Sequence, residues 1–265
     1  MSAAARLLGK VAVVTGAAQG LGRDIAARLV ADGADVLLVD RQRQAGEAAA
    51  RHMGAAATYV EADITDDDQI QAAIDTAMAR FGRLDFLVNN ACVYADQGLA
   101  SPREMWLQTL NVNLVSAAMF THLASAVMGH GSVIVNVGST GGKFGAAGRA
   151  LYPASKAGLL QITRNIAVTL APRGIRCLSV SPAWTWSPAM EAMTGGDQAR
   201  ADAVGARLHP LGRVGRGEDV AAVVAFACSP DAGWITGVDL PVDGGFSALG
   251  PDQGRSPRQW LADSE

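Results

Sequence analysis

A tyrosine and a lysine four residues apart are the pair in this sequence best suited to acid–base chemistry. Tyr152 and Lys156 share one face if they lie on a helix, and Pro153 between them fits only a first helical turn. Tyrosine is a poor base at neutral pH because its pKa is about 10, but a neighbouring ammonium group lowers that pKa. The pair could therefore exchange a proton with an alcohol, although it could also be an ordinary surface pair.

A glycine-rich turn near the N-terminus is suited to hold a pyrophosphate. The segment TGAAQGLG (15–22) follows an apolar run and opens a predicted helix. Glycine allows a tight turn and close approach of the backbone, and a helix N-terminus attracts negative charge. The residues expected to contact a dinucleotide here are Gly16, Gln19, Gly20, Leu21 and Gly22.

An acidic residue ends the second apolar run. Asp40 follows Gly16 by 40 − 16 = 24 residues, where a carboxylate can hydrogen-bond the hydroxyls of an adenosine ribose. It would also repel a 2′-phosphate. Arg41 could pair with such a phosphate, but residues 17–19 of the turn include no basic side chain. The sequence therefore predicts NAD as the cofactor, with NADP disfavoured.

The elements that would position these residues alternate between apolar runs and helix-length segments. Continuous apolar strands joined by helices indicate right-handed βαβ units and a parallel sheet. We expect an α/β fold: a Rossmann-type, doubly wound, parallel seven-stranded sheet in a single domain over residues 1–250. Residues 184–216 are expected to form a substrate loop or lid, and residues 251–265 a polar C-terminal tail. The predicted strands are 10–15, 34–40, 58–63, 86–90, 132–139, 175–181 and 238–243.

Composition excludes several other classes of protein. Of the 265 residues, 49% are hydrophobic and 18% charged, and the net charge is −3 with no basic run, so nucleic acid is not an expected partner. No uncharged apolar stretch is long enough to predict a membrane span. The N-terminal MSAAARLLGK is too short before the first strand for a signal peptide, so the cytoplasm is expected.

Cysteine and histidine show no spacing typical of a metal site. The three cysteines are far apart and lie in or beside apolar runs, which predicts buried structural thiols and no bound metal.

The motifs and their order resemble the short-chain dehydrogenase/reductase family over most of the chain, from about Gly9 to Phe246. Ser139 precedes Tyr152 by 152 − 139 = 13 residues, the separation usual in that family. The matching motifs are TGAAQGLG (15–22), Asp63, NNAC (89–92), Asn113 in NVN (111–113), Ser139, YPASK (152–156) and SPA (181–183).

The resemblance implies four catalytic residues. Tyr152 would be the acid/base, and Lys156 would lower its pKa and bind the nicotinamide ribose. Ser139 would hydrogen-bond the substrate oxygen, unless it is only a turn hydroxyl. Asn113 would interrupt its helix and hold a water that links Lys156 to solvent, with Asn111 as the rival residue.

The resemblance also implies further cofactor contacts. Asp63 would accept from the adenine amino group, with Ile64 beside the ring, although Asp63 could instead cap the following helix. Asn90 would line the cofactor cleft. The nicotinamide carboxamide is expected near Pro182, Thr185 and Ser187.

Two positions depart from the family pattern. Cys92 and Ala183 stand where glycine is usual, and either would be strained if its position requires a positive φ.

Aromatic residues predict a bulky substrate. Tyr94, Phe144, Trp184 and Trp186 follow carboxyl ends of predicted strands, where ligands bind in such sheets. They suggest an apolar, ring-bearing secondary alcohol or ketone, unless they only pack the loops. No basic residue is clearly placed to hold a carboxylate, and Arg149 is the nearest candidate.

The expected function is NAD-dependent interconversion of such an alcohol and its ketone. An NADPH-dependent acyl-chain ketoreductase and a non-catalytic dinucleotide sensor are the alternatives. Helices near 102–128 and 152–171 are strongly apolar, and the family pairs them between subunits. A homotetramer is therefore expected.

Overall fold

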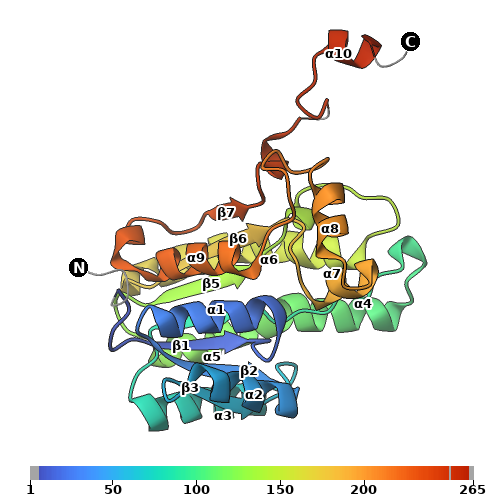
Figure 1. Ribbon diagram of the computed structural model, residues 1–265. Helices are drawn as coiled ribbons and strands as arrows, with labels where there is room; N and C mark the ends of the chain where they lie inside the picture. The colour runs from blue at the N-terminus through green and yellow to red at the C-terminus, as the bar shows by residue number, and fades with distance from the viewer. Residues whose placement is uncertain (1–5, 251, 263–265) are drawn as a thin grey trace.

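Seven parallel strands form one sheet in the computed structural model, which describes residues 6–250 and 252–262 (Figure 1). The strand order is β3-β2-β1-β4-β5-β6-β7, so the predicted sheet and its fold class are confirmed. The strands are β1 Val11–Thr15, β2 Asp35–Asp40, β3 Ala57–Glu61, β4 Phe86–Asn89, β5 Val133–Val137, β6 Arg176–Pro182 and β7 Asp239–Val242.

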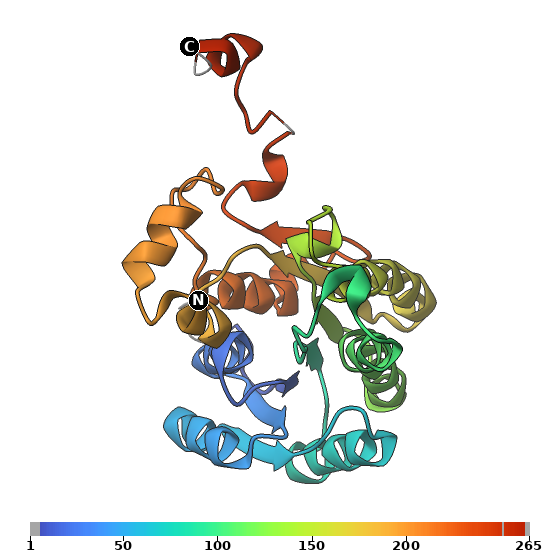
Figure 2. The same ribbon diagram turned by 90° about the vertical axis from the view of Figure 1, so that its right-hand side faces the viewer.

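Helices cover both faces of the sheet, as Figure 2 shows in a view along the strands. One core lies beneath α1 (Gly20–Ala31), α2 (Arg43–Met53) and α9 (Gly217–Cys228). The other lies beneath α3 (Asp67–Phe81), α5 (Ser116–Val127) and α6 (Leu151–Leu170). Successive residues of β1 enter opposite cores, which is why the strands read as continuous apolar runs. The remaining helices are α4 Arg103–Leu110, α7 Pro188–Thr194, α8 Gln198–Gly205 and α10 Pro257–Ala262.

The sheet order reverses between β1 and β4. The chain moves from β1 outward to β2 and β3, then crosses back to β4 on the other side of β1. Connections therefore diverge from the carboxyl ends of these two strands, and a crevice opens there.

Residues 184–216, predicted as a substrate loop or lid, contain two short helices, α7 and α8, and their role over the substrate stays a prediction. The ends of this segment are joined: the amide of Trp186 donates to the carbonyl of Gly215 over 2.9 Å, and the amide of Gly215 donates to Trp184 over 2.8 Å. Pro188 at the start of α7 and Gly195 after it fit a helix of two turns.

The polar tail leaves the body of the domain and carries α10 (Figures 1 and 2). Residues 1–5 of the predicted domain and residues 251 and 263–265 of the predicted tail lie outside the described residues.

One helical stretch is long and apolar enough to cross a membrane by length and composition. It runs from Arg103 to Val127 through α4, a π-helical turn (η3, Asn111–Val115) and α5, with a mean hydropathy of 1.3. Phe120 and Ala124 of this stretch are buried against the sheet, as in a core helix of a soluble fold. The absence of a membrane partner stays a prediction.

A buried carboxylate fixes the start of the two central strands. Asp85, just before β4, accepts from the amide of Val11 over 3.0 Å and pairs with Lys10 and Arg83 at 3.0 and 2.7 Å. Burial acts to raise the pKa of Asp85, but these hydrogen bonds outweigh it and hold the pKa below its usual value.

We therefore expect Asp85→Asn to lower the free energy of unfolding at pH 7 by about 1–3 kcal/mol. Because the folded pKa is depressed, the contribution of the carboxylate is complete above the unfolded pKa and is lost as the pH falls through the folded value. Urea unfolding should show that the difference in free energy of unfolding between wild type and Asp85→Asn is smaller at pH 3 than at pH 6. The control Asp75→Asn alters an exposed carboxylate on α3 and should change little at either pH. A difference that grows toward pH 3 would contradict this account.

Candidate active site

A cleft of about 410 Å³ lies at the carboxyl ends of β1 and β4, where the sheet order reverses. Most of the predicted cofactor residues line it. Thr185 is not among its lining residues, and its hydroxyl donates to the carbonyl of Ala183 over 3.2 Å. The predicted residues that line it are Gly16, Gln19, Gly20, Leu21, Gly22, Asp40, Asp63, Ile64, Asn90, Tyr152, Lys156, Pro182 and Ser187.

The glycine turn leaves no space for side chains at two positions. Gly16 has a φ of 65°, and a Cβ on Gly22 would lie 2.2 Å from the carbonyl oxygen of Gly16. Gln19, the N-cap of α1, makes no capping hydrogen bond through its side chain. The first amides of α1 therefore face the cleft without an intrahelical partner, as a pyrophosphate would require. The residues present fit a dinucleotide.

Asp40 is 8% exposed and is held by two backbone amides. Its carboxylate accepts from Ala18 and from Gln42, each over 3.0 Å. A carboxylate oxygen can accept more than one hydrogen bond, so ribose hydroxyls can still be bound. Arg41 also lines the cleft and is exposed.

Asp63 does not cap the helix that follows it, so that alternative is wrong. Its carboxylate accepts from the amide and hydroxyl of Thr65 over 2.9 and 2.8 Å, which lowers its pKa. Asp66 caps α3 instead, accepting from the amides of Asp68 and Gln69. Asp63 and Ile64 are therefore left facing the adenosine end of the cleft.

The two departures from glycine cause no backbone strain. The only non-glycine residue with a positive φ in the described part of the chain is Gln253, so neither Cys92 nor Ala183 is strained.

The prediction of three buried thiols is wrong for Cys92, which is half-buried and lines the cleft. Cys177 and Cys228 are buried, and burial raises the pKa of each to about 12. Within residues 6–250 and 252–262, no group of three or more His, Cys, Asp or Glu side chains is arranged to hold a metal.

Tyr152 and Lys156 lie on the first two turns of α6 and face the cleft. Lys156 is only 2% exposed. Its ammonium donates to the carbonyl of Val137 over 2.7 Å and lies 5.7 Å from the centre of the Tyr152 ring. A buried ammonium beside a partly buried phenol ring is not an ordinary surface pair.

The net change in the pKa of Tyr152 is opposite to the lowering that its pairing with Lys156 predicts. Burial raises the pKa of Tyr152, and this outweighs the opposing effects of Lys156, Arg149 and a hydrogen bond with Ser139. Cys92 adds to the rise. The protein by itself thus favours the protonated phenol, a form suited to donate a proton to a ketone oxygen.

Ser139 is fixed by the turn that it begins. Its hydroxyl accepts from the amide of Gly141 over 3.0 Å and caps a short 3₁₀ turn (η4, Thr140–Gly142). Lys143 after this turn forms an ion pair with Asp239 of β7, and Asp239 also accepts from Ser181 over 2.6 Å. The loop that carries Ser139 is therefore tied to the edge of the sheet.

Asn113 lies in the π-helical turn η3, and its amide joins two segments. It accepts from and donates to the backbone of Val93, over 2.8 and 3.0 Å, and donates to the hydroxyl of Ser155 over 3.1 Å. Asn111 is exposed, whereas Asn113 is buried beside the catalytic helix. The side-chain amide of Asn113 is thus engaged with protein groups.

The predicted substrate residues are only partly brought together. Tyr94 lines the cleft and stacks on Tyr152, with ring centres 5.1 Å apart. Phe144 packs edge-on against Phe246 and is 44% exposed, and Trp184 is 43% exposed. These two residues and the partly buried Trp186 do not line the cleft that contains Tyr152.

Sequence reasoning missed Asp96, which caps the catalytic helix from a distant part of the chain. Its buried carboxylate accepts from the amides of Ala150 and Tyr152, over 3.0 and 3.1 Å, and from Gly98 over 2.9 Å. These backbone hydrogen bonds outweigh the effect of burial and lower the pKa of Asp96. The sequence offers one indirect indication of such a cap. Ala150, the N-cap of α6, has no side-chain acceptor, so the first amides of the helix need an acceptor from elsewhere.

Comparison with known proteins supports one assignment for the whole chain. The family model described as "Enoyl-(Acyl carrier protein) reductase" matches residues 16–247. The chain is 37% identical to the cis-4-hydroxycyclohexanecarboxylate dehydrogenase of Sinomonas cyclohexanicum, covering 91% of this chain and 97% of that protein. It is 36% identical to a 3-oxoacyl-(acyl-carrier-protein) reductase of Thermotoga maritima, covering 91% and 99%. A crystal structure of a short-chain dehydrogenase/reductase from Brucella melitensis superposes with a TM-score of 0.85 at 32% identity, covering 91% of this chain and 98% of that one.

Asp96→Ala should impair both folding and chemistry, because it leaves the first amides of α6 without an acceptor and frees the backbone of Tyr152. We expect a loss of about 1–2 kcal/mol in the free energy of unfolding, together with a reduced kcat. The matched control is Asp66→Ala, which removes a similar cap from α3. It should cost comparable stability and leave kcat nearly unchanged. Thermal unfolding and initial rates test this, and an equal loss of kcat in both variants would reject a positioning role.

Proposed function

We propose that this chain, which belongs to the short-chain dehydrogenase/reductase family, is an NAD-dependent oxidoreductase that interconverts a ring-bearing secondary alcohol and its ketone. The observation that carries the proposal is the buried Lys156 beside Tyr152 at one end of the cleft that begins at the glycine turn. Ser139, whose hydroxyl acts to lower the pKa of the same phenol, completes the set.

A nicotinamide dinucleotide, when bound, supplies the acceptor or the donor of the hydride. In oxidation, the Tyr152 phenolate takes the hydroxyl proton as the carbinol carbon loses its hydride, and in reduction the phenol returns it. Ser139 holds the substrate oxygen within reach of Tyr152. Lys156 stabilises the phenolate, offsetting the cost of its burial. Asp40 and the first amides of α1 hold the adenosine and pyrophosphate portions.

The substrate is proposed to be bulky and apolar. Tyr94 and Tyr152 present stacked rings in the cleft, and Phe144 and Trp184, which do not line it, are exposed aromatic residues. The relative from Sinomonas cyclohexanicum is named for its action on cis-4-hydroxycyclohexanecarboxylate, a cyclohexane ring that bears a hydroxyl group. Aromatic side chains contribute large contact areas to such a ring.

The second candidate is an NADPH-dependent acyl-chain ketoreductase. It is favoured by the 36% identity to the reductase of Thermotoga maritima, which is named for a 3-oxoacyl chain on a carrier protein. Asp40 at the ribose position argues against NADPH, because its carboxylate repels a 2′-phosphate. A non-catalytic sensor would have no need of Ser139, Tyr152 and Lys156 together.

A homotetramer in the cytoplasm, without nucleic-acid or membrane partners, completes the proposal. Exposed apolar side chains on the long helices support self-association: Leu107 is 61%, Val115 46% and Val168 77% exposed.

The experiment that tests the function is a screen of ring alcohols and ketones with NAD(H) and NADP(H), followed at 340 nm, beside the variant Tyr152→Phe. Loss of the transferable proton should reduce kcat by about 10²–10⁴-fold while NADH binding persists. Because burial raises the pKa of Tyr152, alcohol oxidation should accelerate as the pH rises. Binding of NADH without turnover of any substrate would favour the sensor, and near-normal turnover by Tyr152→Phe would remove Tyr152 from the mechanism.

Cofactor choice is tested at Asp40. The variant Asp40→Ala removes the repulsion of a 2′-phosphate and two ribose hydrogen bonds, so the ratio of kcat/KM for NAD to that for NADP should fall by at least about tenfold. Steady-state kinetics with both cofactors measure this ratio. A wild-type enzyme that works better with NADP would overturn the choice of NAD.

A further inference from the structure

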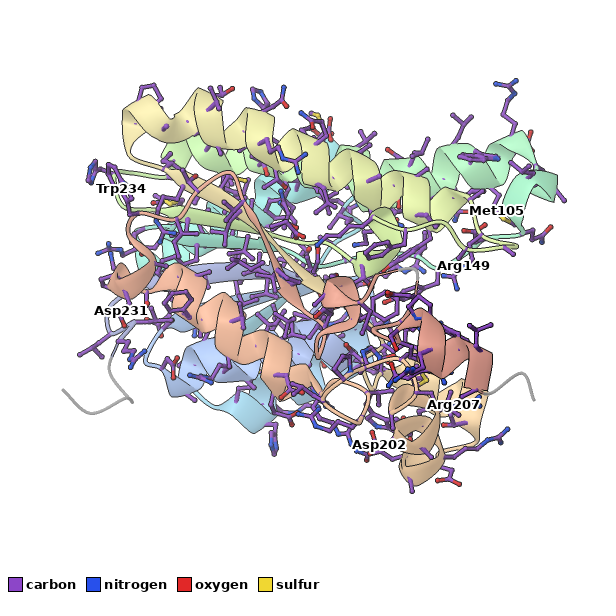
Figure 3. All side chains as sticks on the ribbon, turned by 90° about the horizontal axis from the view of Figure 1, so that it is seen from above. Met105, Arg149, Asp202, Arg207, Asp231 and Trp234 are labelled. Atoms are coloured by element: carbon purple, nitrogen blue, oxygen red, sulfur yellow. The ribbon has the colours of Figure 1, made fainter. Side chains whose placement is uncertain are left out.

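Arg149 places a positive charge beside the catalytic tyrosine. It stands three residues before Tyr152 in the sequence, and its guanidinium carbon lies 5.7 Å from the centre of the Tyr152 ring. The side chain is 47% exposed, so the cation is reachable from solvent. Figure 3 shows Arg149 at the end of the molecule opposite Trp234 and Asp231.

Among the described residues, Arg149 forms only a long ion pair with Asp96. The carboxylate nearest to Arg149 is Asp96, with its oxygen 4.0 Å from the arginine Nε, too far for a hydrogen bond. That carboxylate is already engaged by the amides of Gly98, Ala150 and Tyr152. In the described part of the chain, no hydrogen bond from the Arg149 side chain is found.

The position of Arg149 limits what an anionic partner can be. A guanidinium group presents paired N–H donors that match the two oxygens of a carboxylate. Because this group lies against the ring of the acid/base itself, the anion must be close to the reacting carbon. A phosphate at the far end of a long acyl carrier arm would lie well beyond it.

The aromatic rings beside Arg149 indicate which kind of group lies between the reacting carbon and the anionic end of the substrate. Tyr94 stacks on Tyr152 and is 56% exposed, so the space beside Arg149 has an aromatic wall. Arg149 also acts to lower the pKa of both phenols, as expected of a cation close to the two rings. A compact apolar ring with polar groups at opposite ends fits these surroundings.

We infer that Arg149 binds a carboxylate of the substrate, so that the enzyme acts on a ring alcohol or ketone that bears a carboxylate within one ring width of the reacting carbon. The inference rests on the proposed function and adds the substrate class and its anchor. The competing role is structural: Arg149 could serve only to hold the Tyr152 ring through a cation–π contact.

The test compares 4-hydroxycyclohexanecarboxylate with its uncharged carboxamide, as mixed isomers, in the complete enzyme with NAD. Wild type should show kcat/KM about 10- to 100-fold higher for the acid. In Arg149→Gln the ratio of acid to amide should approach one, and Arg149→Lys should keep part of the preference. The control Arg51→Gln removes the same charge from the distant helix α2, where Arg51 pairs with Glu47, and should keep the wild-type ratio.

Cyclohexanecarboxylate, which lacks the hydroxyl, gives a readout independent of turnover. It should inhibit wild type competitively and inhibit Arg149→Gln about 10- to 100-fold less strongly. Equal kcat/KM for acid and amide in wild type would overturn the inference and leave the proposed function standing. If Arg149→Gln lowers kcat/KM equally for the acid and the amide, Arg149 has only the structural role. Failure of every ring alcohol and ketone with both cofactors would overturn the proposed function itself.

Discussion

The site depends on a set of hydrogen bonds that joins the carboxyl ends of β1 and β4. These two strands are adjacent in space and far apart in sequence. The side-chain amide of Asn90 donates to the carbonyls of Thr15 and Gly16, over 2.9 and 3.2 Å. In return the hydroxyl of Thr15 accepts from the amides of Asn90 and Ala91. These hydrogen bonds hold the glycine turn against the segment after β4. A side chain on Gly16 would collide with Ala91, so the close approach requires glycine.

The segment that follows this junction also fixes the catalytic helix. The backbone of Val93 is held by Asn113, whose amide reaches Ser155 on α6. A few residues later, Asp96 caps the first turn of α6 and binds the amide of Tyr152 itself. A single stretch of chain therefore connects the cofactor turn to the acid/base. Any shift of that stretch would move Tyr152 relative to a bound dinucleotide. The stretch is held by hydrogen bonds, which are directional and therefore fix its position more closely than apolar contacts would.

The parts of this molecule that repeat a local pattern were predictable from the sequence. The seven strands follow from apolar runs, and the pairing of Tyr152 with Lys156 follows from helical spacing. The contribution of Asp96 was not predictable, because its partners Ala150 and Tyr152 are more than fifty residues away in the chain. The raised pKa of Tyr152 depends on burial, which spacing does not report. The helices α7 and α8 are not predicted by the sequence analysis, because the glycines and prolines near their ends are typical of a loop.

Two cations lie about Tyr152. Lys156 lines the cleft there, and Arg149 stands beside the Tyr152 ring without being one of the residues that line the cleft. An anionic group next to Tyr152 is therefore attracted by both cations. Lys156 is buried and donates to the carbonyl of Val137, so it is not readily available to a ligand. Arg149 is half-exposed and its ion pair with Asp96 is long, at 4.0 Å, so it is the more accessible of the two cations. On the proposed function, a carboxylate held there would place the reacting carbon next to the phenol, and Ser139 would hold the substrate oxygen.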